Sequence, residues 1–178
     1  MDGEQRRVLA GMAAAAGVTV LALAVAMPVL EPILAPMLRP TMRDAAARLL
    51  FAARVELFVA LPLACCIGVM AARRFLSPAD IAGSAFAPPG ERTAVPLAVL
   101  QNTLEQTVLA VVAHLGFAAT VRVAELALLP VLAALFCLGR LAFAVGYRHG
   151  AGGRAFGFAL TFFPTNVALL WAIARTLG

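Results

Sequence analysis

The sequence predicts an all-α protein that is embedded in a membrane as a bundle of transmembrane helices. Of its 178 residues, 63% are hydrophobic and only 13% are charged. A soluble domain is ordinarily about 45–50% apolar and about 25% charged, and a domain of this size has too much surface to hide such an excess. The apolar residues also form long runs, and a bilayer admits only helices or closed barrels.

Five apolar runs predict the helices in order. They cover residues 8–30, 44–74, 93–120, 123–147 and 155–174. About 20 residues are enough to cross the hydrocarbon core. The longest polar connection, residues 75–92, contains Ser77-Pro78 and Pro88-Pro89-Gly90, which are loop signals, and residues 147–154 form a second hydrophilic break. Only a few residues near 119–122 separate the third and fourth runs, so we expect these two helices to form a tight hairpin.

The first run permits two interpretations. Arg6 and Arg7 precede it and small residues follow at 24–26, as in a cleaved signal peptide. However, its apolar part is longer than the ~7–15 residues of a signal peptide. This length favours a retained membrane helix.

Prolines follow the first run at every fourth position. Each one removes a backbone donor, so we expect the helix to end or bend in this region. The prolines are Pro28, Pro32, Pro36 and Pro40. We therefore divide the chain into an N-terminal helix with a proline-rich connector, residues 1–43, and a four-helix membrane domain, residues 44–178.

All 14 basic residues are arginines, and most lie at the ends of apolar runs. This placement is typical of interface anchors and topology signals rather than of nucleic-acid binding. The expected side of the N-terminus carries Arg6, Arg7, Arg73, Arg74, Arg92, Arg148 and Arg154. The other side carries Arg39, Arg43, Arg48, Arg122 and Arg175. The small excess leans toward a cytoplasmic N-terminus.

Polar side chains within the runs are the candidates for function, because ionisable groups at membrane depth are costly and usually face the bundle interior. Asn102 and Glu105 are three residues apart and share a helix face. Arg140 and Tyr147 are seven apart, two helical turns, and also share a face.

The expected topology brings these side chains to one end of the bundle, where further arginines lie. The second helix ends there at Arg73 and Arg74, and Arg154 opens the fifth. The result would be a basic pocket with one carboxylate and one amide at its floor. Such a pocket suits a small anionic ligand that also carries a cationic group.

Structural roles explain the same residues equally well at this point. Asn102 and Glu105 are also typical of polar contacts that join membrane helices, and Arg140 could form a structural ion pair with Glu105. For His114 we favour packing or hydrogen bonding. The three cysteines lie inside apolar runs and are poor candidates for a metal site.

Three sequence motifs together resemble one membrane family. They are GRLAFAVGYRHGAGGR at 139–154, NTLE at 102–105, and the arginine pair at 73–74 before a proline-containing loop. Their order and spacing resemble those of the membrane-associated proteins in eicosanoid and glutathione metabolism. The resemblance spans about residues 44–178 and leaves the N-terminal helix outside.

The resemblance implies a four-helix membrane protein that forms a homotrimer and binds glutathione, as co-substrate, between neighbouring subunits. Arg154 would stabilise the thiolate, because a nearby guanidinium lowers a thiol pKa. The implied glutathione-binding residues are Arg73, Arg74, Asn102, Glu105, Arg140 and Tyr147. The implied activity is a glutathione-dependent transferase or peroxidase that acts on lipophilic electrophiles or lipid hydroperoxides.

Three positions depart from the eicosanoid branch of the family. Ala98 replaces a glutathione-binding arginine, and Gln106 and Phe143 stand where tyrosines occur. These differences argue against leukotriene or prostaglandin synthesis and favour a divergent bacterial-type member in the inner membrane. The alternative is a non-catalytic membrane scaffold or lipid-binding protein. A transporter is less favoured, because no pair of broken-helix repeats is visible.

Overall fold

The computed structural model describes residues 1–178 apart from 43, 84, 85 and 87, and it is helical in nearly all of this part. Arg43, at the expected domain boundary, therefore lies outside the described residues. The elements are α1 (Gly3–Leu38), α2 (Ala45–Phe75), α3 (Glu91–Thr120), the 3₁₀ helix η1 (Val123–Leu128), α4 (Leu129–Gly146), the 3₁₀ helix η2 (Tyr147–His149) and α5 (Gly150–Leu177). The all-α class predicted from the sequence is confirmed.

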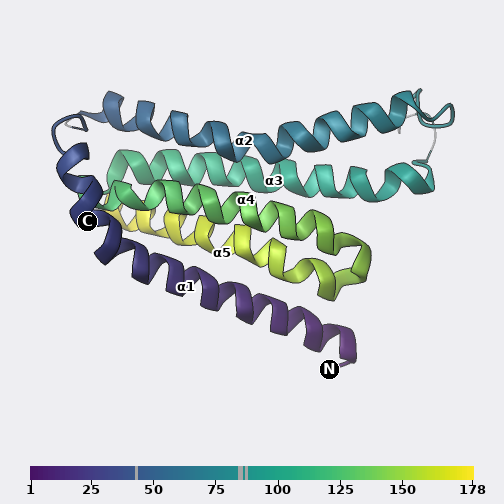
Figure 1. The fold of residues 1–178 in the computed structure, drawn as a ribbon, viewed down its shortest axis with the longest axis horizontal. Helices are drawn as coiled ribbons and strands as arrows, with labels where there is room; N and C mark the ends of the chain where they lie inside the picture. The colour runs from purple at the N-terminus through teal and green to yellow at the C-terminus, as the bar shows by residue number, and fades with distance from the viewer. Residues whose placement is uncertain (43, 84–85, 87) are drawn as a thin grey trace.

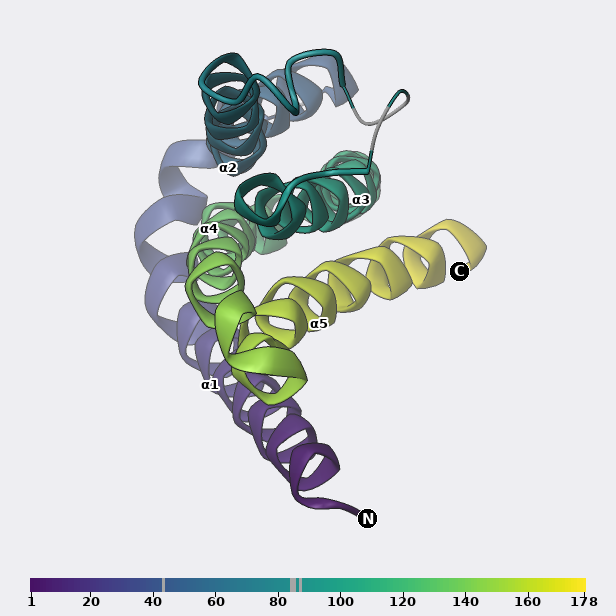
Figure 2. The same cartoon turned by 90° about the vertical axis from the view of Figure 1, so that its right-hand side faces the viewer.

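The helices run up and down along one common direction, as Figure 1 shows. α5 packs against α1, α3 and α4, while α2 packs mainly on α3 and also on α4. Figure 2 shows α1 and α2 on opposite sides of the inner helices. The end of α2 and the start of α3 lie at the same end of the bundle as the N-terminus and the α4–α5 reversal.

Four stretches of the described chain are long and apolar enough to cross a membrane. Three of them fall within α1, α2 and α3, and the fourth covers residues 123–177. That last stretch holds two antiparallel helices, because the chain reverses at η2 between α4 and α5 (Figure 1).

The proline-containing segment is helical for longer than we expected. α1 continues through Pro28, Pro32 and Pro36 and ends only at Leu38, and its axis turns over this part in Figure 1. The prolines are four residues apart, so the backbone bonds that they remove lie on one face and the helix bends rather than ends. The connector therefore belongs largely to the helix.

The α4–α5 reversal is also more compact than the glycine-rich sequence suggested. η2 makes a single turn and α5 already begins at Gly150, which has a φ of +80°. A Cβ on Gly157 would overlap the backbone nitrogen of Phe143, and one on Gly139 would lie 2.7 Å from the Thr161 side chain. These glycines let α4 and α5 approach closely and so fix where Arg140 sits.

Candidate functional site

Arg140 is the most deeply buried of the candidate residues, with only 3% of its surface exposed. Its Nη1 donates a hydrogen bond to Asn102 Oδ1 of α3 at 2.9 Å, and its Nη2 donates to Thr161 Oγ1 of α5 at 3.0 Å. Its Nε is buried and has no hydrogen-bond partner within the described chain. One donor of a buried cation therefore remains free to bind an acceptor.

Asn102 connects this guanidinium to Glu105 one turn further along α3. Asn102 Nδ2 donates to Glu105 Oε2 at 3.4 Å, and Gln101 Nε2 donates to Glu105 Oε1 at 3.0 Å. The alternative of a direct Arg140–Glu105 ion pair is wrong for the single chain, because the bonds of Arg140 go to Asn102 and Thr161. Glu105 is exposed although it lies near the middle of α3.

Tyr147 and Arg154 join Arg140 through an aromatic side chain that the sequence analysis had counted as a loss. The Arg140 guanidinium lies 4.4 Å from the centre of the Phe143 ring, and Phe143 meets Tyr147 edge-on at 5.4 Å. The Arg154 guanidinium lies 4.5 Å from the centre of the Tyr147 ring. The face of an aromatic ring attracts a cation electrostatically. The two rings therefore hold the two guanidinium groups of Arg140 and Arg154 in one stack.

Five of the seven candidate residues thus form one continuous series of contacts across three helices. In order, the series is Glu105, Asn102, Arg140, Phe143, Tyr147 and Arg154. Neither Phe143 as a spacer nor Thr161 as a partner was predicted from the sequence. Helical spacing identifies residues that share a face of one helix, whereas these contacts depend on how separate helices pack.

Arg73 and Arg74 lie at the same end of the bundle but belong to different contacts. Arg73 Nη1 donates to the backbone carbonyl of Arg92 at 2.6 Å. Arg74 acts electrostatically on the carboxylate of Asp80 in the α2–α3 connection. Within one chain these two arginines therefore hold the connection and are not part of the series around Arg140.

Asp80 organises this connection, although its sequence position did not mark it as a candidate. Its carboxylate accepts hydrogen bonds from the Gly90 backbone N–H at 2.8 Å and from the hydroxyls of Ser77 at 2.7 Å and Thr93 at 3.0 Å. The Gly90 bond is the main reason why the pKa of Asp80 lies below its ordinary value, with Ser77, Thr93 and the charge of Arg74 acting in the same direction against desolvation.

An apolar groove opens beside Arg140 between α2, α3 and α4. It consists of two adjoining cavities of about 270 and 340 Å³ that share Cys65, Cys66 and Ala144. Arg140 lines one cavity and Arg148 the other. Cys137 also lines the groove, so the three cysteines of the chain gather there. Among the described residues, no three His, Cys, Asp or Glu side chains are placed to hold a metal ion.

Comparison with known proteins decides the family. The model of the MAPEG family matches residues 49–175, which is most of the chain. The chain belongs to the MAPEG family. Neither the curated proteins nor the solved structures contain a match. Together with the long apolar helices, membership makes the chain an integral membrane protein of the glutathione and eicosanoid metabolism family.

The MAPEG match begins inside α2 and ends near the end of α5. It includes the whole series around Arg140, and it leaves α1 outside. α1 nevertheless packs along α5 and η1.

Proposed function

We propose that this MAPEG protein is a membrane enzyme that activates glutathione, or a related thiol, toward lipophilic substrates. The observation that carries the proposal is the series of contacts from Glu105 to Arg154 next to an apolar groove. It offers one carboxylate, one amide and two guanidinium groups at the edge of an apolar space.

Glutathione has the charges that this arrangement would accept. Its ammonium group would pair with Glu105, and a carboxylate would accept a charge-assisted hydrogen bond from the free Nε of Arg140. Arg154 would lie near the sulfur and favour the thiolate, which is the nucleophile. Arg73 and Arg74 would take part from a neighbouring subunit, because their own chain uses them elsewhere.

Two reactions suit an activated thiolate in this place. In conjugation, the sulfur forms a bond to an electrophilic carbon, and a leaving group departs or the adduct takes up a proton. In peroxide reduction, two glutathione molecules are oxidised to a disulfide while a lipid hydroperoxide is reduced to an alcohol and water. The groove beside Arg140 would receive the lipophilic partner from the bilayer.

Subunit association is part of the same proposal. Glu105 is an exposed carboxylate in the middle of a membrane-spanning helix, and such a group is costly in contact with lipid. A homotrimer, as the family resemblance implies, would cover it and would bring arginines of a second chain to the ligand. We place the protein in the inner membrane of a bacterium, because the sequence resembles a bacterial-type member of the family.

A non-catalytic role is the second candidate, and a specific observation favours it. By the family resemblance, Phe143, at the centre of the series, stands where a tyrosine occurs, and Ala98 stands where an arginine occurs. With fewer ligand-binding groups, the chain would act as a membrane scaffold or lipid-binding protein and would use Arg140 only to join α3, α4 and α5.

Calorimetry of glutathione binding to the purified protein in detergent tests the proposal. We expect the Glu105→Gln variant to bind about tenfold more weakly, because a charge-assisted hydrogen bond is lost. The Arg154→Ala variant should still bind glutathione but should raise the pKa of the bound thiol. Arg54→Gln, which removes an exposed arginine of α2, is the control. An absence of wild-type binding at millimolar glutathione would favour the scaffold.

A further inference from the structure

A polar cavity lies at the end of the bundle opposite Tyr147, between the C-terminal part of α1 and η1. It has a volume of about 400 Å³ and is lined by Met27, Glu31, Arg39, Arg122, Val123, Ala124 and Glu125. A neighbouring cavity of about 250 Å³ follows the proline face of α1 and shares Glu31 and Arg39 with it. Both shared residues lie outside the segment that matches the MAPEG family.

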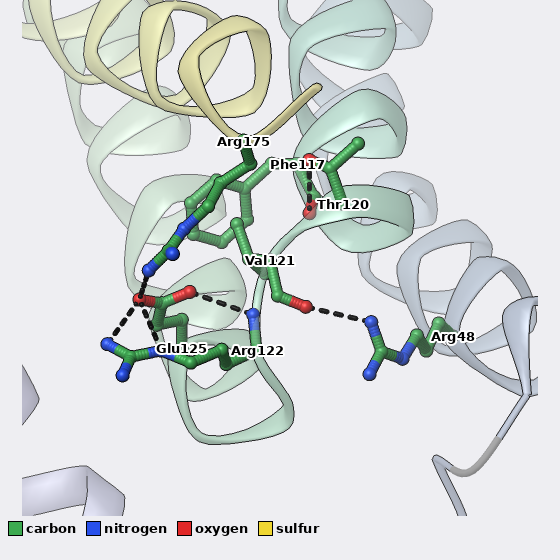
Figure 3. A network of polar contacts seen from close by, with 7 residues as sticks. All are labelled: Arg48, Phe117, Thr120, Val121, Arg122, Glu125 and Arg175. Atoms are coloured by element: carbon green, nitrogen blue, oxygen red, sulfur yellow. Dashed lines mark hydrogen bonds and ion pairs between the residues drawn. The ribbon is translucent and has the colours of Figure 1, made fainter. Parts of the chain in front are cut away.

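Glu125 supplies no free negative charge to this cavity, because two arginines already neutralise it (Figure 3). Its Oε1 accepts hydrogen bonds from Arg122 Nη2 at 2.9 Å and from Arg175 Nη2 at 2.6 Å, and its Oε2 accepts from the Arg122 backbone N–H at 2.8 Å. The Arg122 side chain is 73% exposed. Arg122 and Arg39 therefore give the cavity a basic side with positive charge in excess.

Glu31 gives the cavity an acidic side. It is half-buried, and neither Glu31 nor Arg39 has a hydrogen bond or ion pair in the part of the chain that the structure describes. The neighbouring cavity, which Pro28 and Pro32 line, adds two further acceptors from the backbone. Pro32 and Pro36 have no N–H, so the carbonyls of Pro28 and Pro32 lack the donor that a helix normally provides. Glu31 lines both cavities, and Pro28 and Pro32 line the second one beside it.

We propose that this cavity binds a phosphate ester that carries a primary ammonium group, the chemistry of a phosphoethanolamine head group. The phosphate would lie between Arg39 and Arg122, since guanidinium groups bind phosphate oxygens in bidentate fashion. The ammonium group has three N–H donors, which match the carboxylate of Glu31 and the carbonyls of Pro28 and Pro32. A quaternary ammonium has no such donor, and a head group without an amine leaves Glu31 unpaired.

An apolar groove of about 490 Å³ on α1 favours a phospholipid as the source of this group. It is lined by Val18, Leu21, Ala22, Val25, Ala26, Val29 and Leu30. Val29 is three residues before Pro32 and so shares a helix face with the lining of the neighbouring cavity. An acyl chain would lie along this groove while the head group enters the polar cavity. A soluble phosphoethanolamine would use the polar cavity alone.

Native mass spectrometry of the full chain in detergent tests the site. The probes are phosphatidylethanolamine, phosphatidylcholine and phosphatidylglycerol with the same acyl chains. We expect one phosphatidylethanolamine per chain, bound about tenfold more tightly than phosphatidylcholine, because charge-assisted N–H bonds distinguish the two. Glu31→Gln should abolish this preference, and Arg39→Gln should weaken the binding of all three lipids. Glu91→Gln and Arg6→Gln remove equal charges at the opposite end and should change nothing.

Competition with soluble O-phosphoethanolamine then separates the two sources. Displacement of the lipid at millimolar concentration would assign the site to the free ester as well, whereas retention of the lipid would assign it to the membrane; both results support the site. Thermal unfolding without lipid confirms that each variant is folded. Equal binding of the three lipids by the wild type, or an undiminished preference in folded Glu31→Gln, would overturn the proposal.

Discussion

Glu56 of α2 and His114 of α3 face each other in the interior of the membrane domain. His114 is fully buried, Glu56 is 8% exposed, and Nδ1 of the imidazole lies 2.7 Å from Glu56 Oε1. The hydrogen-bonding role that the sequence suggested for His114 is confirmed. The second carboxylate oxygen and Nε2 of the ring have no partner among the described residues, so this pair depends on its single bond.

We predict that Glu56→Ala destabilises the protein by about 1–3 kcal/mol, because it leaves a buried imidazole without its partner. Glu56→Gln keeps an acceptor of the same shape and should cost less. The measurement is thermal unfolding in detergent, with Glu91→Ala as an exposed control. Equal losses in the Gln and Ala variants would mean that the charge of Glu56, rather than the hydrogen bond, provides the stability.

Asp80 gives the α2–α3 connection a dependence on pH. The pKa of this carboxyl group is lowered by its bonds to Gly90, Ser77 and Thr93, so the charged form stabilises the folded state. This contribution is present above the ordinary pKa of about 3.9 and is lost as the pH falls through the lower, folded-state value.

We therefore predict that acidification below about pH 4 lowers the unfolding temperature of the wild type more than that of Asp80→Asn. At pH 7 the wild type should be the more stable protein, because only the carboxylate accepts all three bonds. Parallel unfolding curves for the two proteins from pH 3 to pH 7 would show that the connection does not depend on this charge.

At the scale of elements, the close approach of α4 and α5 places Arg140 next to Thr161. Gly157 permits this approach, because a Cβ there would overlap the backbone of Phe143. We predict that Gly157→Ala lowers the free energy of unfolding by about 1–3 kcal/mol through overpacking. It should also weaken the binding of any ligand that depends on Arg140. The control is Gly68→Ala in α2, where a Cβ has no atom within 4 Å; it should be neutral or stabilising. Thermal unfolding in detergent measures the stability of both variants. Equal stability of Gly157→Ala and Gly68→Ala would contradict this packing.

The apolar runs predicted the helices well because crossing a bilayer fixes both length and composition. Where the observed helix bounds differ from the expected ones, the cause is local chemistry. α1 bends at its prolines and continues to Leu38, because prolines with a spacing of four bend a helix without unwinding it. Residues 150–154 are mostly helical because their glycines fit against α1 and the end of α4. The i, i+3 pair of Asn102 and Glu105 was found from spacing. The Asn102–Arg140 bond was not, because it depends on the packing of two helices.

At the scale of the whole molecule, the outer face of α3 differs from the exposed apolar surface of α1. It carries Gln101 and the carboxylate of Glu105 beside exposed Leu104, Val108 and Val112. A polar group at this depth requires a protein or ligand partner, whereas isolated valines do not. We infer that a second copy of the chain covers this face, as the proposed trimer requires.

We predict that Val108→Trp shifts the protein from trimer to monomer in mild detergent, because the larger tryptophan side chain prevents close packing of α3 against the neighbouring chain. Val20→Trp makes the same change on an exposed position of α1 and should leave the trimer intact. Light scattering corrected for bound detergent gives the mass of the protein alone. If the wild type is a monomer, or if the two variants behave alike, α3 is not the interface and no second chain covers Glu105. In that case a bound ligand would have to supply its partner, and glutathione should stabilise the monomer without changing its mass.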